Sequence, residues 1–417
     1  MILREKFSIL RMMKQFLKKI IPRVVLGGYY RIMEFFAALR FGFPGKRLNV
    51  IGVTGTKGKS TTVYLITRIL EEAGFRVASN SSIESRISRE SKPNRVHMTM
   101  PSRFRLQRFL QEAKRRECDV IVLEVTSEGL AQRRGDFIHF QIALLTNLTP
   151  EHIESHGSYE NYKEAKRRLF ELLDKKGIAI VNEDDKEARY FLDAHEGKSV
   201  TYSVKKSPRP LDIRLIGEFN QYNALAAYTV CRVIGVEGSL IKEVLRRITY
   251  IPGRLEEISE GQPFRVFVDY AYNTSSLETV LQTLLPMKPK NTSIITLTGS
   301  AGGGRDRWRR PVMGKIAAQY SDKVVITSED SYNEDPWKII QEVREGSEEI
   351  KRTGKNVEIY AIEDRREAIK KALRIARRGD IVLIAGIGTE SSMMTPKGEI
   401  PWNERETVRK ALKTLLK

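Results

Sequence analysis

Residues 52–62 read Gly52-Val53-Thr54-Gly55-Thr56-Lys57-Gly58-Lys59-Ser60-Thr61-Thr62, a glycine-rich stretch that ends in a lysine, a serine and two threonines. It follows a β-branched run that begins at Asn49. It precedes a helical pattern in which Val63, Ile66 and Leu70 share one face. The order of strand, glycine loop and helix predicts one unit of a parallel α/β sheet.

The loop carries the residue types that a phosphate site needs. Glycines let backbone N–H groups turn inward around phosphate oxygens, and the start of the following helix favours an anion. Lys59 can reach the β- and γ-phosphates of a nucleotide, and the Ser60 hydroxyl suits Mg²⁺. The spacing is a variant, because Val53 stands where the common pattern has its first glycine. The alternative interpretation is a glycine turn with a solvated lysine.

The composition indicates a globular, basic chain of two or three domains. It has 417 residues, of which 41% are hydrophobic and 30% are charged, and this excludes the disordered and collagen-like classes. The formal net charge of +20 indicates anionic partners. Cys118 and Cys231 are the only cysteines, so we expect no disulfide framework, no cysteine metal site and a cytoplasmic location.

Short β-branched runs alternate with helical patterns along most of the chain, which predicts mostly parallel sheets covered by helices on both faces. The sequence divides into a basic segment (1–47), a first α/β domain (48–251) and a second α/β domain (252–417). The expected strands are 49–54, 119–125, 141–146 and 177–181 in the first domain, and 265–270, 292–298, 323–328, 357–361 and 381–385 in the second.

The first 47 residues hold eleven Lys or Arg against two acids, interleaved with large apolar side chains. An amphipathic helix is predicted before Pro22, with one apolar face listed here: Ile9, Met13, Phe16, Leu17 and Ile20. No apolar run is long enough to span a bilayer, and no signal-peptide cleavage pattern is present. Two readings stay open, namely an interfacial helix on anionic lipid and a helix docked on its own domain.

Two further segments fall at expected strand ends, where parallel sheets place their ligands. Glu124 follows the buried run 120–123 and could supply a hard oxygen ligand to Mg²⁺. The stretch Thr146-Asn147-Leu148-Thr149-Pro150-Glu151-His152 follows the next strand. Convergence on one sheet edge makes His152 a candidate ligand, although a lone histidine is more often structural.

Together these segments resemble the Mur ligase family, which forms peptide bonds on cell-wall precursors with ATP, and the likeness runs from Asn49 almost to the C-terminus. The resemblance implies a central ATPase domain with a phosphate loop and a Rossmann-like C-terminal domain. It implies that Glu124 and His152 bind two Mg²⁺ ions. The segment 162–166 matches the region of the family's carbamylated lysine, so Lys166 is expected to carry a carbamate whose oxygen replaces a repelling ammonium.

The resemblance also implies the nucleotide contacts. The segment 217–227 is similar to the family's adenine-side motif, and residues 253–256 and 268–271 are similar to its G-R-x-E and D-Y-A-H segments. The expected ATP-binding residues are Gly55, Thr56, Lys57, Gly58, Lys59, Ser60, Thr61, Asn220, Arg254 and Asp269. Of these, Lys59 is expected to be catalytic, together with Glu124, His152 and Lys166.

Substrate contacts follow from the branch of the family that adds the third residue of the stem peptide. The expected residues are Thr99, Ser127 and Arg134 for a muramoyl-peptide acceptor, and Arg305, Asp306, Asp330 and Glu390 in the second domain for the amino-acid donor. Members that add diaminopimelate read D-N-P-R ahead of an acidic-Pro pair, where this chain has Glu329-Asp330-Ser331-Tyr332 ahead of Asp335-Pro336. Arginine is the residue that grips a carboxylate with two hydrogen bonds, so we expect a donor other than diaminopimelate.

The family's tripeptide synthetases have a uridine-binding domain before the phosphate loop, and here fewer than fifty residues precede the strand that leads into the loop. A lipid-linked or differently presented acceptor is therefore an alternative to a UDP-linked one. Lys57 replaces a usual Asn, Glu128 a His, and Tyr272-Asn273 a His-Thr pair. The resemblance implies an amide ligase that works through an acyl phosphate. The alternatives are a folylpolyglutamate-type ligase of the same superfamily and a non-catalytic, membrane-attached nucleotide-binding partner. We expect a monomer, no nucleic-acid partner and a cytoplasmic protein, with attachment to the inner membrane face left open.

Overall fold

The first sheet is built around β1 (Val50–Thr54), all of whose residues are buried. The computed structural model describes residues 23–93, 99–151, 153–207, 209–304 and 306–417. β1 lies between two parallel neighbours in an eight-stranded sheet of order β4-β3-β2-β5-β1-β6-β7-β8. The other strands are β2 (Val77–Asn80), β3 (Glu84–Ile87), β4 (Glu90–Pro93), β5 (Val120–Glu124), β6 (Phe140–Leu145), β7 (Leu173–Asn182) and β8 (Lys198–Tyr202).

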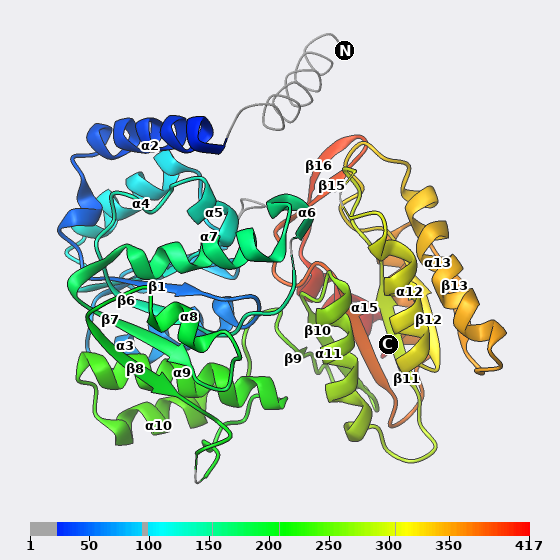
Figure 1. Cartoon of the computed structure of the whole chain (residues 1–417). Helices are drawn as coiled ribbons and strands as arrows, with labels where there is room; N and C mark the ends of the chain where they lie inside the picture. Colours follow the sequence, from blue (N-terminus) through cyan, green and yellow to red (C-terminus); the bar gives the residue numbers. More distant parts are fainter. Residues whose placement is uncertain (1–22, 94–98, 152, 208, 305) are drawn as a thin grey trace.

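Successive side chains of a strand point to opposite faces of the sheet, and here those on both faces are mostly apolar. Helices therefore cover both faces. Ile51 and Val53 of β1 pack with α3, α9 and α10, whereas Val50 packs with α4, α7 and α8. Figure 1 shows α9 and α10 below the sheet and α4, α5 and α7 above it. The helices are α2 (Arg23–Arg40), α3 (Lys59–Glu72), α4 (Arg103–Arg115), α5 (Ser127–Ala131), α6 (Ile153–His156), α7 (Tyr159–Glu171), α8 (Ala188–Leu192), α9 (Glu218–Ile234) and α10 (Gly238–Arg247), with a 3₁₀ turn at Pro44–Lys46.

A second sheet of six strands follows in the order β13-β12-β11-β14-β10-β9, and only β9 runs antiparallel. Its strands are β9 (Glu256–Glu257), β10 (Arg265–Asp269), β11 (Ile294–Thr298), β12 (Lys323–Ile326), β13 (Glu358–Ala361) and β14 (Ile381–Ala385), and a separate hairpin pairs β15 (Ser392–Thr395) with β16 (Gly398–Pro401). One face is covered by α11 (Thr274–Leu284), α12 (Arg309–Tyr320) and α13 (Pro336–Arg352), and the other by α14 (Arg365–Arg374) and α15 (Glu404–Leu415).

All nine expected strands are present, so the predicted α/β class with mostly parallel sheets is confirmed. The sequence pattern missed β2, β3, β4, β8, β9 and the β15-β16 hairpin. These strands are two to five residues long, and several are rich in polar residues. The boundaries expected after residues 47 and 251 stay predictions. The chain passes from α10 to β9 through residues 248–255.

The amphipathic pattern expected at residues 9–20 lies outside the described residues. Within the part of the chain that is described, no helix is both long and apolar enough to cross a membrane.

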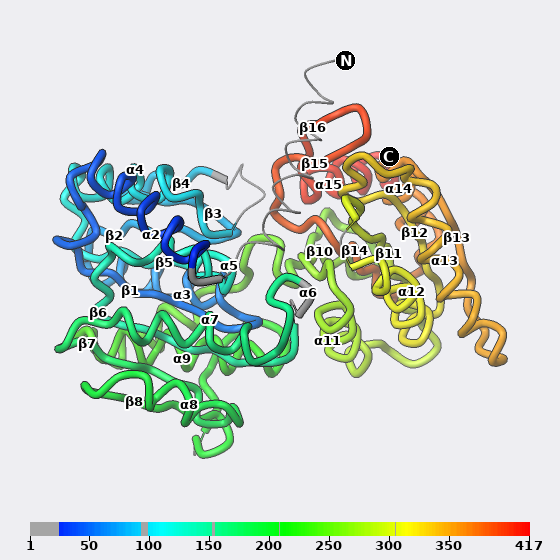
Figure 2. The backbone as a smooth tube through the Cα atoms, turned by 45° about the horizontal axis from the view of Figure 1, so that its top comes forward, coloured from blue at the N-terminus to red at the C-terminus, as the bar shows by residue number. Residues whose placement is uncertain are grey.

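Figure 2 shows the two sheets side by side, with β15 and β16 reaching over the second one.

The second domain is fastened by a fully buried ion pair between Arg365 of α14 and Glu404 of α15. Arg365 also donates to the carbonyl oxygens of Ser328 at 3.1 Å and Ala385 at 2.8 Å. Trp402 Nε1 donates to Glu404 Oε2 at 2.6 Å. Because the guanidinium is buried, loss of its carboxylate partner would leave an uncompensated charge.

We therefore expect Glu404→Ala to lower the free energy of unfolding by about 3–5 kcal/mol, measured by urea denaturation. The matched control is Glu406→Ala, on the same helix, which removes a half-exposed carboxylate that lies 3.4 Å from Lys410. That change should cost less than about 1 kcal/mol. Equal effects of the two substitutions would contradict the structural role of the buried pair.

Candidate active site

The phosphate loop joins β1 to α3 and is held by the strand end that follows β6. Lys57 N donates to Asn147 Oδ1 at 2.9 Å. The Thr146 hydroxyl and the Asn147 amide both donate to the Lys57 carbonyl, at 2.7 and 3.0 Å. Gly58 adopts φ 82°, and a Cβ there would lie 2.1 Å from Asn223 Oδ1. The loop conformation is therefore fixed by its neighbours in the fold.

Lys59 and Ser60 open α3, where unpaired backbone N–H groups favour an anion. Lys59 Nζ donates to the Thr56 carbonyl at 2.7 Å, so the ammonium bends back over its own loop. The Thr56 hydroxyl lies 2.9 Å from the Tyr162 hydroxyl of α7. The Lys59 ammonium and the N-terminus of α3 thus face the same space.

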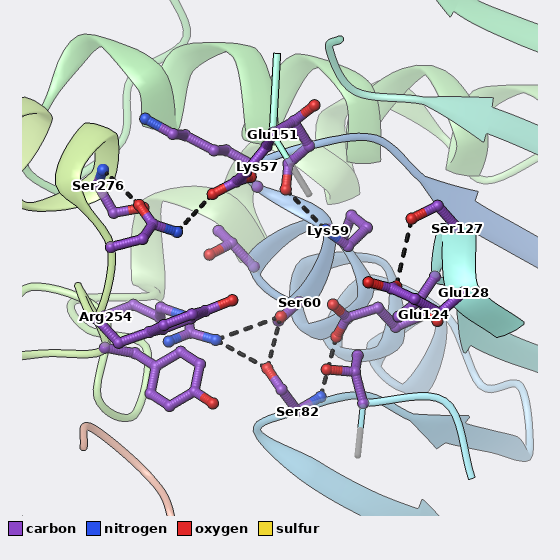
Figure 3. A pocket seen from close by; sticks show the side chains of 18 of the residues that line it. Lys57, Lys59, Ser60, Ser82, Glu124, Ser127, Glu128, Glu151, Arg254 and Ser276 are labelled. Carbon is purple, nitrogen blue, oxygen red and sulfur yellow. Dashed lines mark hydrogen bonds between the residues drawn. The ribbon is translucent and has the colours of Figure 1, made fainter. Parts of the chain in front are cut away.

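Ser60 and Glu124 meet through Ser82, as Figure 3 shows. The Ser60 and Ser82 hydroxyls are 2.8 Å apart, and Ser82 N donates to Glu124 Oε2 at 2.9 Å. Glu124 ends β5 and is only 4% exposed. A hydroxyl and a carboxylate are hard oxygen donors of the kind that Mg²⁺ prefers.

Among the described residues, no group of three or more His, Cys, Asp and Glu gathers as a metal site. Two protein oxygens fit Mg²⁺ better than Zn²⁺ or Ca²⁺, because Mg²⁺ usually keeps waters and takes further ligands from substrate phosphates. The donor set therefore fits a nucleotide-bound Mg²⁺ ion.

Lys166 of α7 is buried beneath the loop, and its Nζ donates to the Gly55 carbonyl at 2.6 Å. The Nζ also lies 4.6 Å from the centre of the Tyr162 ring. Burial, with a smaller contribution from the nearby Lys59 ammonium, lowers the pKa of Lys166 well below its usual value. This lowered pKa shifts the Lys166 side chain toward its neutral amine, which carries a lone pair.

The second domain reaches the phosphate loop through Arg254. Its guanidinium donates to the hydroxyls of Ser82 at 2.8 Å and Ser60 at 3.3 Å, and it stacks 4.5 Å from the centre of the Tyr270 ring. Lys57 Nζ donates to Thr279 of α11 at 3.2 Å. These contacts connect the two sheets across the space between them.

Two carboxyl groups in the second domain have perturbed acidity. Burial raises the pKa of Asp269 to about 6, and Asp269 Oδ2 accepts from Leu255 N at 2.7 Å. Burial likewise raises the pKa of Glu329 to about 7, and Glu329 Oε1 accepts from Gly299 N at 3.1 Å. Both groups line the space between the domains.

That space is a cleft of about 1800 Å³ that collects most of the expected site residues. Its lining includes Thr56, Lys57, Gly58, Lys59, Ser60, Thr61, Thr99, Glu124, Ser127, Arg134, Lys166, Arg254, Asp269, Asp306, Asp330 and Glu390. Gly55 and Asn220 lie behind the lining, where Asn220 donates to the Ile216 carbonyl at 2.7 Å and accepts from Asn223. His152 and Arg305 fall outside the described residues.

Several of these side chains already have protein partners. Arg134 donates to the Met100 carbonyl and to Gln132 Oε1, both at 2.7 Å, so it shapes the wall as well as facing the cleft. Asp330 Oδ1 accepts from Met394 N at 2.7 Å. Glu390 Oε1 accepts from the Tyr270 hydroxyl at 2.6 Å.

Sequence reasoning missed Ser82, Tyr162 and Glu329 as lining residues. Ser82 follows β2, a strand too short and polar to be recognised from the sequence. Tyr162 and Glu329 stood inside segments that were already quoted, but nothing in their spacing marked them.

Comparison with known proteins agrees with this geometry. Residues 53–212 match the Mur ligase middle domain, and residues 253–388 match the Mur ligase, glutamate ligase domain. A UDP-N-acetylmuramoyl-L-alanyl-D-glutamate–2,6-diaminopimelate ligase from Syntrophomonas wolfei is 35% identical over 92% of this chain and 82% of its own length. A UDP-N-acetylmuramyl-tripeptide synthetase from Roseiflexus sp. is also 35% identical, over 91% of this chain and 81% of its own length.

Solved structures are similar in fold. One UDP-N-acetylmuramoyl-L-alanyl-D-glutamate–2,6-diaminopimelate ligase superposes with a TM-score of 0.58 at 29% identity, over 89% of this chain and 79% of that chain. The structure of E. coli FolC in complex with DHPP and ADP superposes with a TM-score of 0.64 at 18% identity, over 91% of each chain. At this identity the similarity supports only the fold. The two domain matches and the 35% identities confirm the expected resemblance: the chain belongs to the Mur ligase family of ATP-dependent amide ligases.

Proposed function

We propose that this protein joins an amino acid to a UDP-linked muramoyl dipeptide at the expense of ATP, as a tripeptide synthetase. The observation that carries the proposal is one cleft in which Lys59, Ser60, Glu124 and Lys166 of the first domain face residues of the second. The relatives named as diaminopimelate ligase and tripeptide synthetase support this type of acceptor.

In the proposed reaction the acceptor carboxylate attacks the γ-phosphorus of ATP and releases ADP, which gives an acyl phosphate. The donor amine then attacks the acyl carbon, phosphate leaves, and the amine loses a proton to solvent. Lys59 and the N-terminus of α3 stabilise the negative charge that develops on the phosphoryl oxygens. Arg254 holds Ser60 and Ser82 in place from the second domain.

Ser60 and Glu124 are the described residues that would hold Mg²⁺, with His152 expected beside a second ion. When bound, the metal supplies electrostatic stabilisation of phosphoryl oxygens. Thr99, Ser127 and Arg134 would contact the acceptor, and Asp306, Asp330, Glu390 and the expected Arg305 would contact the donor. The Asn220 side chain donates a hydrogen bond to the Ile216 carbonyl inside the wall of the cleft. Asn220 would therefore support the nucleotide site from behind its lining.

Lys166 is proposed to be carbamylated. Carbamylation joins a neutral amine to CO₂ and releases one proton, so it requires the lone pair that burial preserves on Lys166. The carbamate would place a negative oxygen in the cleft, where a bare ammonium would repel Mg²⁺.

Lys59→Ala should lower kcat for acceptor-dependent phosphate release by about 100-fold to 1000-fold, because a preorganised charge at the phosphoryl group is lost. The assay compares phosphate release with UDP-muramoyl dipeptide, with and without each amino acid. Lys175→Ala, at an exposed position, is the control and should leave kcat unchanged. Near-normal turnover of the Lys59 variant, or phosphate release that ignores the acceptor, would refute the proposed reaction.

Lys166→Ala should abolish turnover, and added bicarbonate should not restore it, because the amine that binds CO₂ is gone. The carbamate itself is tested by ¹³C NMR of wild-type protein in ¹³C-bicarbonate, where a carbamate carbon signal should appear and should be absent from Lys166→Ala. An active Lys166→Ala variant would exclude the assigned role. Absence of the carbon signal in the active wild type would exclude the modification.

The donor is proposed to be an amino acid other than diaminopimelate, such as lysine. Tyr332 lines the donor side of the cleft, and its phenol cannot make the paired hydrogen bonds that an arginine gives to a distal carboxylate. Steady-state kinetics across donors should therefore give a lower kcat/KM for diaminopimelate than for lysine. Tyr332→Arg should raise kcat/KM for diaminopimelate relative to the wild-type protein. A clear wild-type preference for diaminopimelate would reverse this assignment.

The rival acceptors are tested in the same assay. A folylpolyglutamate-type ligase would release phosphate with a folate and glutamate. A non-catalytic nucleotide-binding protein would release none with any acceptor. The proposed setting is a monomer in the cytoplasm, in keeping with two unpaired, buried cysteines. The sequence pattern at residues 9–20 also suggested an anionic membrane surface as a partner.

A further inference from the structure

The described part of α2 has an unusual amount of apolar surface. Val25, Tyr29, Ile32, Phe36 and Leu39 are each more than half exposed. Their spacing of four, three, four and three residues keeps all five within about 80° of arc on a helix. We call these five residues the α2 stripe. Figures 1 and 2 show α2 at the margin of the first domain, next to α4.

The exposed charged residues described on α2 are positive, and its acidic residue is buried. Arg31 and Arg40 are exposed. Glu34 is the only acid of the helix, and it lies opposite the stripe and is fully buried. The outward surface of α2 therefore combines large apolar side chains with positive charge and no described negative charge.

The opposite face of α2 is fixed to the first domain. Glu34 Oε1 accepts from Gln107 Nε2 of α4 at 2.9 Å, and Ala37 and Ala38 are fully buried. The Arg103 guanidinium lies 5.6 Å from the centre of the Tyr30 ring. The stripe is therefore displayed on a helix that is anchored through its other side, and it does not supply the contacts that hold α2 in place.

We propose that the α2 stripe docks on an anionic lipid surface. Apolar side chains flanked by arginine and free of exposed acids match the composition of helices that lie in the membrane interface. The charge pattern continues in the sequence, since residues 1–22 contain six Lys or Arg and one Glu. A second copy of the chain is a poorer occupant, because pairing two stripes would bring the same positive charges together.

Docking of this kind would also orient the cleft. α4 follows directly after Thr99 and Met100, which line the cleft, and Arg103 of α4 contacts α2. Gly27 of α2 lies against the Arg133 side chain, next to Arg134 of the same wall. The wall assigned to the acceptor would then lie beside the lipid. This orientation rests on the proposed function, whereas docking itself does not.

The experiment is vesicle flotation of the full chain without substrates. The vesicles contain either phosphatidylcholine alone or equal parts of phosphatidylcholine and phosphatidylglycerol. Wild-type protein should float with the anionic vesicles, less at high salt, and stay in solution with the neutral ones. The variant Ile32→Glu/Phe36→Glu should lose at least about tenfold in the vesicle partition coefficient, because it places two negative charges in the stripe.

Two controls keep the result specific. Leu415→Glu/Leu416→Glu makes the same charge change at exposed positions of the C-terminal end and should float like wild type. Ile32→Leu/Phe36→Leu retains an apolar stripe and should float as well. Urea denaturation of each variant checks that the fold is intact. Loss of phosphate release by a variant with an intact fold would concern the proposed function, not docking.

Three outcomes would overturn docking through α2. One is failure of the wild-type chain to bind anionic vesicles. Another is unchanged flotation of Ile32→Glu/Phe36→Glu, which would assign attachment to residues before α2. The third is a dimer, seen by light scattering, that the same substitutions abolish while flotation is unaffected, because the stripe would then be a contact between copies.

Discussion

The hydrogen bonds between the side chains of Thr146 and Asn147 and the backbone of Lys57 are the constraint on which the site depends. They join the loop after β1 to the segment after β6, and this is possible because the two strands are parallel neighbours. Parallel strands end at the same edge of a sheet, so residues far apart in sequence meet there. With the loop fixed, Lys59 and Ser60 start α3 at the cleft, and the Gly55 carbonyl faces Lys166.

Arg254 connects the phosphate-loop region to the second domain. It is the residue whose guanidinium bonds to both Ser60 and Ser82 while stacking on Tyr270. Tyr270 in turn donates to Glu390. A short series of contacts thus connects the phosphate loop after β1 to Glu390 in the second domain. Any ligase of this type must bring two substrates together, and these contacts define the space in which they would meet.

Burial gives the site its chemistry as much as residue type does. Burial lowers the pKa of Lys166 well below its usual value, because few solvent dipoles reach the charged form. The same effect holds Asp269 and Glu329 closer to neutrality than exposed carboxyl groups. On α2 the reverse applies, since apolar side chains stay in water while the single acid is buried. Each departure from ordinary burial marks a place where we infer function.

Local patterns in the sequence predicted the α/β class, nine of the strands and the phosphate loop, because periodicity and glycine spacing act over a few residues. It also identified the segments that carry Glu124 and Lys166, through their resemblance to a family. Contacts between distant segments show that Ser82 bridges Ser60 and Glu124, that Asn220 lies behind the wall, and that Arg254 crosses between the sheets. Such contacts depend on strand order and on the relative placement of two domains, which no local pattern encodes.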